Sequence, residues 1–148
     1  MTAAHLRPAT RADIAGMHRV RLAVRENRLT SGVIGEADYV PAIEASGRGW
    51  VIVEHGEVRG FAVGNAVSGN IWALYVDPAH EGRGFGRRLH DAMVQWLFAQ
   101  GLPLLALGTE AHTRAQRFYE AAGWRRTGPG ERGEVAFELR ASDILQAR

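Results

Sequence analysis

One segment of the sequence constrains the fold more than any other: a short apolar run that ends at a proline, followed by three alternate glycines and an amphipathic pattern. The apolar run covers residues 71–76, the glycines are Gly82, Gly84 and Gly86, and the amphipathic pattern covers residues 84–100. A short apolar run bounded by turn residues predicts a buried strand, and the 3.6-residue periodicity predicts a helix. The segment therefore predicts a strand–loop–helix unit of an α/β fold.

The loop of this unit has the composition of an anion-binding turn. The first N–H groups of a helix lack internal acceptors, and glycines let successive amides converge on a ligand. The helix dipole adds partial positive charge, and Arg83, Arg87 and Arg88 add full charges. Glycine spacing alone favours a mere tight turn. The combination with three arginines and a second motif, described below, favours a diphosphate ligand.

Particular residues exclude two sharper nucleotide-binding motifs. All 18 basic residues are arginine, so the chain has neither the lysine of a P-loop nor a lysine for Schiff-base or general-base chemistry. A dinucleotide-binding fingerprint counted from Gly82 meets Arg87 where glycine or alanine is required, and one counted from Gly84 meets Leu89. The net charge at pH 7 is only +2, and acidic residues lie among the arginines, which suits a small polyanion better than a duplex.

The size of the chain fits a single domain over residues 1–148, with 46% hydrophobic residues to build a full core. The absence of cysteine excludes disulfides, thiolate zinc sites and cysteine nucleophiles. The longest apolar runs are far shorter than the ~20 residues that cross a bilayer. Residues 1–11 include a histidine, two arginines and a proline where a signal peptide needs apolar residues. We therefore expect a cytoplasmic protein without a membrane span.

Strand-like and helix-like patterns alternate along the rest of the chain. Thr10 with Asp13 three residues later resembles a capping box and opens a helix. Residues 102–107 predict a buried strand that a helical crossover brings beside residues 71–76. No element is assigned after residue 140. The other expected strands cover residues 5–9, 50–54, 58–67, 124–127 and 135–139, and the other expected helices cover residues 36–45 and 113–122.

Two stretches resemble motifs of the GNAT superfamily of acyl-CoA-dependent N-acyltransferases. The motif A loop, Gln/Arg-x-x-Gly-x-Gly/Ala, is matched by residues 81–86, with Glu81 in the first place. Motif B is matched by residues 115–124, with His112 in the place of the usual asparagine. Residues 6–10 are similar to the opening of the family. The stretches follow one another in the family order, and two motifs at the family spacing identify the chain as a member.

The resemblance implies a mixed, mostly antiparallel central sheet of about six to seven strands flanked by about four helices. It also implies acetyl-CoA as co-substrate, with its pyrophosphate on the amides of residues 83–87 and its pantetheine arm along residues 74–76. A bulge in that strand would separate it from the next strand and admit the thioester. The cofactor-binding residues expected on this basis are Leu74, Tyr75, Val76, Glu81, Gly82, Arg83, Gly84, Phe85, Gly86, Arg87, Arg88, His112, Ala115, Phe118 and Tyr119.

For chemistry, the resemblance implies acyl transfer to a primary amine by direct attack, without a covalent enzyme intermediate. Tyr119 occupies the general-acid position of the family; the alternative is a core aromatic, a role that Phe118 beside it can fill. Glu26 is the candidate general base, because family substrates approach from the side of the first helix. Glu110 and His112 are alternatives, since a glutamate can orient a water and histidine is a common general base.

Two other functions stay open at this point. One is an acyl-CoA-binding regulatory module that keeps the loop without catalysis. The other is a nucleotide-binding or RNA-binding protein, although the arginine pattern favours no nucleic-acid partner. No spacing of histidines and carboxylates indicates a metal site. The amine acceptor is unidentified, residues 28–47 are expected to shape its pocket with Trp72, and the resemblance allows a homodimer.

Overall fold

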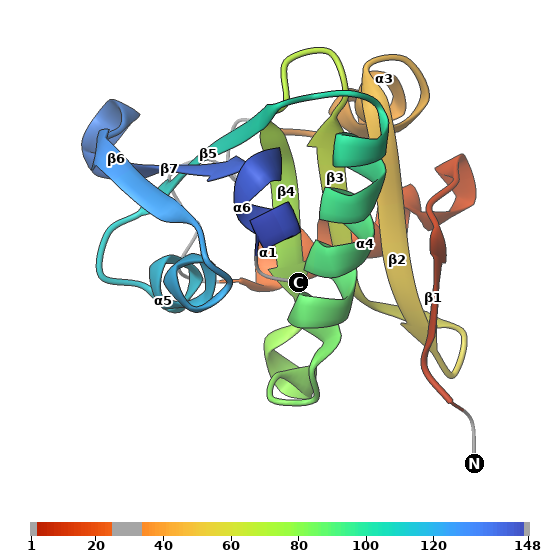
Figure 1. Cartoon of the computed structure of the whole chain (residues 1–148). Coiled ribbons are helices and arrows are strands. Elements are labelled where there is room, and N and C mark those ends of the chain that lie inside the picture. Colours follow the sequence, from red (N-terminus) through yellow and green to blue (C-terminus); the bar gives the residue numbers. More distant parts are fainter. Residues whose placement is uncertain (1–2, 25–33, 147–148) are drawn as a thin grey trace.

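The computed structural model describes residues 3–24 and 34–146, which form two antiparallel sheets side by side (Figure 1). The first sheet has the strand order β1-β2-β3-β4, and the second has the order β5-β7-β6. The predicted α/β class and mostly antiparallel arrangement are confirmed, although the central sheet is divided in two. The strands are β1 (His5–Pro8), β2 (Gly47–Glu54), β3 (Glu57–Asn65), β4 (Ile71–Val76), β5 (Leu104–Glu110), β6 (Arg125–Pro129) and β7 (Glu134–Arg140).

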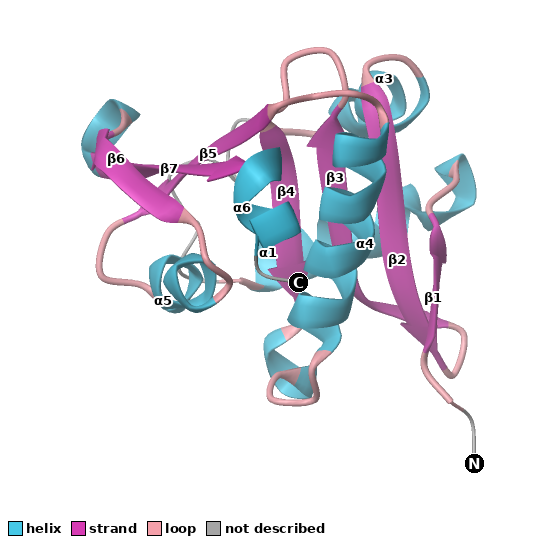
Figure 2. Cartoon of the chain, in the orientation of Figure 1, coloured by secondary structure: helices cyan, strands magenta, loops and turns pink. Residues whose placement is uncertain are grey.

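Five α-helices in the described part of the chain surround the sheets (Figure 2). The last one corrects an expectation, because the segment after Arg140 is a helix whose Ile144 packs against the core. None of the described helices is long and apolar enough to cross a bilayer. The helices are α1 (Ile14–Ala23), α3 (Tyr39–Glu44), α4 (Phe85–Ala99), α5 (Arg114–Ala121) and α6 (Ala141–Gln146).

The start of the first helix confirms the predicted capping signal. A 3₁₀ turn, Arg11–Asp13, precedes α1, and the Thr10 amide donates to Oδ2 of Asp13 at 2.8 Å. Arg7 on β1 donates two further hydrogen bonds to the same carboxylate, at 2.8 and 2.9 Å. The buried Asp13 side chain therefore fixes both the beginning of α1 and its orientation relative to β1.

Helices α4 and α1 pack on opposite faces of the first sheet, each with its own apolar layer (Figure 1). Gly64 in β3 brings α4 close, because a Cβ there would lie 2.7 Å from Cδ1 of Leu97. The α4 layer includes Leu89, Met93, Leu97, Ile52 and Ala62, and the α1 layer includes Ile14, Met17, Val20, Val51 and Phe61.

The two sheets meet at β4 and β5, where one parallel bridge, Asn70 with Ala106, joins them among the described residues. The sequence predicts that residues 102–107 lie beside residues 71–76. The structure confirms that the two segments lie next to each other at this bridge, although β5 begins at Leu104 and forms its ladder with β7. Beyond the bridge, the edges of β4 and β5 are not hydrogen-bonded to one another.

A bulge in β4 accompanies this separation. Val63 of β3 pairs with Ala73, but its neighbour Gly64 pairs with Ile71, so Trp72 is an additional residue in β4. A bulge bends its strand and increases the local twist. It also changes the alternation of side chains, so that Trp72 packs with the α1 layer together with Tyr75.

A buried histidine, His90, connects α4 to the C-terminal half. Nε1 of Trp124 donates to Nε2 of His90 at 2.9 Å, and Nδ1 of His90 lies 2.8 Å from Oδ1 of Asp91. Because Nε2 accepts, the neutral ring carries its proton on Nδ1 and donates it to Asp91. Burial lowers the pKa of His90, against the opposing effect of Asp91. The ring also contacts Phe118 edge-on, so this contact holds α5 against α4.

Acidification from pH 7.5 to 5.5 is expected to lower the free energy of unfolding, because the unfolded chain binds a proton on residue 90 that the native state excludes. This contribution is complete above the unfolded pKa of about 6.5 and falls below it. His90→Phe should remove the dependence and cost about 1–2 kcal/mol, since it leaves the Trp124 N–H unpaired.

Urea unfolding of both proteins at both pH values measures these effects. His5→Asn, at an exposed position in β1, is the control and should keep the pH dependence of the wild type. An unchanged pH dependence in His90→Phe contradicts the assignment.

Candidate active site

A cavity of about 720 Å³ occupies the space between β4 and β5. The loop before α4, the first turns of α4 and α5, and Val24 after α1 complete its wall. It therefore lies where the sheet is divided and where the two predicted motifs meet. The predicted cofactor-binding residues that line it are Leu74, Tyr75, Val76, Glu81, Gly82, Gly84, Phe85, Gly86, Arg87, Ala115, Phe118 and Tyr119.

The other predicted site residues are placed differently. Arg83, Arg88 and His112 are not among the residues that line the cavity. Arg88 is exposed on α4, and the Arg83 side chain points to the β2–β3 hairpin. Glu26, the candidate base, lies outside the described residues. The structure thus brings the two motifs together at one cavity, while two of the three loop arginines direct their charge elsewhere.

The loop before α4 is shaped to present backbone amides. Gly82 and Gly84 have φ angles of 77° and 80°, in the left-handed region that favours glycine. Gly84 is the N-cap of α4, so the positive end of a 15-residue helix lies at the cavity wall. The unpaired first-turn N–H groups of α4 fit an anionic group in this position.

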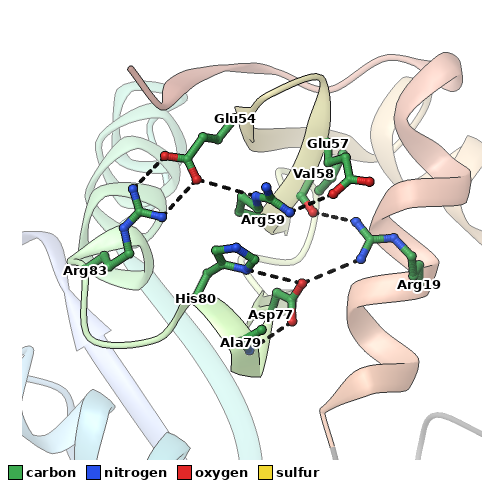
Figure 3. A network of polar contacts seen from close by, with 9 residues as sticks. All are labelled: Arg19, Glu54, Glu57, Val58, Arg59, Asp77, Ala79, His80 and Arg83. Atoms are coloured by element: carbon green, nitrogen blue, oxygen red, sulfur yellow. Dashed lines mark hydrogen bonds and ion pairs between the residues drawn. The ribbon is translucent and has the colours of Figure 1, made fainter. Parts of the chain in front are cut away.

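A network of ion pairs fixes this loop from outside the cavity (Figure 3). Arg83 donates to both carboxylate oxygens of Glu54, at 2.9 and 2.6 Å, and its Cζ lies 4.6 Å from the Phe85 ring centroid. The hydrogen bonds from Arg83 lower the pKa of Glu54 to about 2. Arg59 lies 3.5 Å from the same carboxylate. The Arg83 side chain therefore anchors the loop to β2, which leaves its amide as the group for the ligand.

The other end of the loop is held by a second set of contacts. Asp77 accepts a hydrogen bond from the Ala79 amide at 3.1 Å, which stabilises the turn that follows β4. Arg19 of α1 lies 3.6 Å from Asp77 and donates to the Val58 carbonyl at 2.7 Å (Figure 3). Helix α1 and the hairpin thus support the loop through the same network.

An ion pair between Glu81 and Arg114 joins motif A to motif B across the cavity wall. Glu81 is the departure from the motif A pattern, and Arg114 is the first residue of α5. The arginine compensates a carboxylate that would otherwise repel an anion at the loop. Arg117 and Arg87 also line the cavity, and Arg87 forms an ion pair with Asp91 at 3.0 Å.

Tyr119 of α5 lies in the wall of the cavity with only 6% of its surface exposed. Its ring packs edge-on against Phe118 and Trp124, with centroids 5.3 and 5.5 Å apart. Burial raises the pKa of Tyr119 above its ordinary value, and the nearby Tyr75 raises it further. The hydroxyl is therefore protonated at neutral pH and is able to donate a proton into the cavity.

Glu110 and His112 frame the start of α5. Glu110 lines the cavity, and its carboxylate forms no ion pair with any other residue that the structure describes. His112 has a φ of 62°, and its amide donates to Oε1 of Gln116 at 2.7 Å. Asparagine tolerates this left-handed conformation better than most residues. The backbone conformation therefore accounts for the asparagine that the family motif usually has at position 112. Thr113 caps α5 by accepting from the Gln116 amide at 3.2 Å.

Val24 and His80 line the cavity although no role in the site was predicted for them. Arg117, which also lines it, belongs to an arginine cluster at residues 114–126 whose pattern suits a small polyanion. The spacing of Arg114 and Arg117, one helical turn apart, is the signal that places both on one side of α5. Within the described ranges, no group of three histidine or carboxylate residues could hold a metal ion.

Comparison with known proteins identifies the family of this chain. The family model described as the acetyltransferase (GNAT) family matches residues 17–124, and the chain belongs to this family. A mycothiol acetyltransferase from Beutenbergia cavernae is 40% identical over 63 residues, 42% of this chain, and the match spans 21% of that relative.

Solved structures of low sequence identity share the fold. The N-acetyltransferase of Staphylococcus aureus Mu50 has a TM-score of 0.78 at 19% identity, with 93% of this chain and 98% of that chain covered. The ribosomal-protein-S18-alanine N-acetyltransferase of Escherichia coli has a TM-score of 0.73 at 18% identity, with 92% and 91% covered. The PaiA N-acetyltransferase of Thermoplasma acidophilum, in complex with coenzyme A, has a TM-score of 0.73 at 12% identity, with 93% and 99% covered.

Glu54→Gln is expected to loosen the loop before α4. The amide no longer carries the charge that pairs with Arg83, so hydrogen exchange at the amides of residues 81–85 should be several-fold faster. Hydrogen-exchange mass spectrometry measures this change. In the wild type the contact is complete above the ordinary pKa of 4.5 and is lost as the pH falls through about 2.

Glu57→Gln on the same hairpin is the control, because Glu57 is exposed and pairs with Arg59. It should leave exchange at residues 81–85 unchanged. Equal exchange in wild type and Glu54→Gln would show that the loop does not depend on this ion pair.

Proposed function

We propose that this protein transfers an acetyl group from acetyl-CoA to a primary amine by direct attack. The observation that carries the proposal is the position of the cavity, which extends along the separated edges of β4 and β5 from the glycine loop to the buried hydroxyl of Tyr119. Family membership supports the same reaction class. We name only the chemical class of the acceptor, a primary amine, because the match to the mycothiol acetyltransferase covers less than half of either chain.

The residues present fit an acyl-CoA. The amides of the loop and of the first turn of α4 would hold the pyrophosphate, and Arg87 would add charge to them. The edge of β4, from Leu74 to Val76, faces the cavity and offers backbone groups to the amides of the pantetheine arm. Acetyl-CoA supplies the thioester whose carbonyl carbon the amine attacks.

The protein's part in the chemistry is proton transfer. The amine nitrogen forms a bond to the carbonyl carbon, the carbon–sulfur bond breaks, and Tyr119 gives its proton to the departing thiolate. The amine loses one proton in the same reaction. Glu26 is proposed as its acceptor on the sequence argument, and Glu110 is the alternative from the described wall of the cavity. The high pKa of Tyr119 suits it to end each cycle protonated.

Ligand binding and turnover test the proposal separately. Acetyl-CoA and CoA should raise the melting temperature, while ATP and NAD at equal concentration should not; a ligand at ~100 times its Kd adds about 2.7 kcal/mol. Release of free thiol from acetyl-CoA in the presence of an amine library then measures transfer. Binding without turnover would support a regulatory module, and equal shifts with every phosphate compound would reduce the loop to a general anion site.

Tyr119→Phe is expected to lower kcat about 100-fold, because it removes the general acid. The Kd for acetyl-CoA should stay within about twofold, since the ring and its packing remain. Isothermal titration and thiol release measure the two quantities, and the melting temperature reports that the variant is folded. An unchanged kcat would remove the acid assignment without affecting the cofactor site.

A further inference from the structure

Arg21 of α1 is a buried cation that the mechanism above does not use. Its exposed fraction is 2%, and its Nε and Nη1 groups have no hydrogen-bond partner among the described residues. No described carboxylate forms an ion pair with it. Arg19, two residues earlier on the same helix, shows the usual arrangement, with a bond to the Val58 carbonyl and an ion pair to Asp77. A buried guanidinium with unpaired donors is costly and requires an explanation.

Arg21 is not itself among the residues that line the cavity, but two aromatic side chains that line it contact the guanidinium. Its Cζ lies 5.0 Å from the Trp72 ring centroid and 5.1 Å from that of Tyr75. Both rings line the cavity, and so does Val24, one turn further along the chain. We call the two rings of Trp72 and Tyr75 around the guanidinium the Arg21 frame. The bulge at Trp72 brings the two rings to the same side, because in a regular strand residues 72 and 75 would lie on opposite faces. Tyr39 packs edge-on against Trp72, at 5.0 Å, and fixes the ring from behind.

The frame lies at the α1 side of the divided sheet. Trp72 and Tyr75 pack with the α1 layer, whereas Leu74 and Val76 pack with the α4 layer. The cavity therefore has walls on both faces: the glycine loop lines it at the N-terminus of α4, and the Trp72 and Tyr75 rings line it on the α1 side. A group bound at Arg21 lies across the β4 edge from the α4 layer, at a place that the proposed cofactor leaves free.

We propose that Arg21 binds a carboxylate of the acceptor, so that the substrates are amines that also carry a carboxylate, such as amino acids. This inference rests on the proposed function. A carboxylate that enters between the Trp72 and Tyr75 rings supplies acceptors for the unpaired N–H groups of Arg21 and balances its charge. A single arginine matches one negative charge, whereas a phosphate monoester carries about two and three acceptor oxygens.

Equilibrium binding tests the inference without turnover. The probes are the N-acetylated forms of glycine, alanine, leucine and glutamine, each compared with its carboxamide, on CoA-saturated protein. At least one acid should bind about tenfold or more tightly than its amide. Arg21→Met should abolish this preference and leave the Kd for CoA unchanged. Arg48→Met is the matched control, because Arg48 stacks on Trp96, at 4.9 Å, away from the cavity, and it should keep the preference.

Turnover separates this inference from the proposed function. Faster acetylation of amino acids than of their amides, lost in Arg21→Met through a higher KM, supports both. Equal acetylation of acids and amides, or a preference that survives Arg21→Met, overturns the role of Arg21 and keeps the acetyltransferase. Carboxylate-selective binding without acetylation of any amine keeps Arg21 and overturns the transfer. Should Arg21→Met fail to fold, Arg21→Gln, with the melting temperature recorded, replaces it in both assays.

Discussion

In the described part of the chain, strands β4 and β5 share one bridge, at Asn70 and Ala106, and the site depends on the separation beyond it. A continuous ladder would fill the cavity with backbone hydrogen bonds. The bulge at Trp72 bends β4, and the pairing of β5 with β7 satisfies the other strand. The apolar layer under α4 spans both sheets, so the structure tolerates the division without losing its core. Loop, helix and tyrosine then meet at one opening.

Because the chain has no lysine, arginine provides every positively charged side chain other than histidine, and the role of each arginine depends on its surroundings. Arg83 makes a bidentate contact with Glu54 and fixes the backbone of the loop, and Arg114 neutralises Glu81 beside it. The planar, two-pronged contact of Arg83 suits a guanidinium better than an ammonium group. Arg21 has no such partner in the described residues and is enclosed by rings. The contrast separates arginines whose ion pairs fix the loop and its flanks from Arg21, to which we assign a ligand.

The parts of the fold encoded in local sequence could be predicted, and the parts set by distant partners could not. Residues 71–76 form the predicted strand, and the loop and α4 follow within one residue of expectation. Strand β5 begins beside β4 as predicted, but its ladder with β7 was not predicted, because periodicity identifies a strand and not its hydrogen-bonded partner. The cluster of arginines in the loop predicted that Arg83 contacts the ligand. Its side chain instead pairs with Glu54, which lies 29 residues away in the sequence, and a local pattern does not reveal such a partner. His90 received no role, although its spacing from Val94 matches a buried helix face.

The edge of β4 that forms no ladder with another strand affects the stability of the protein. An edge strand presents unpaired N–H and C=O groups, which in an open sheet invite aggregation with other chains. In this structure that edge faces a cavity that residues of β5 and α5 also line. A ligand that binds the folded protein there would add its binding free energy to the free energy of unfolding. The resistance of the protein to heat and proteolysis would then rise with the concentration of that ligand.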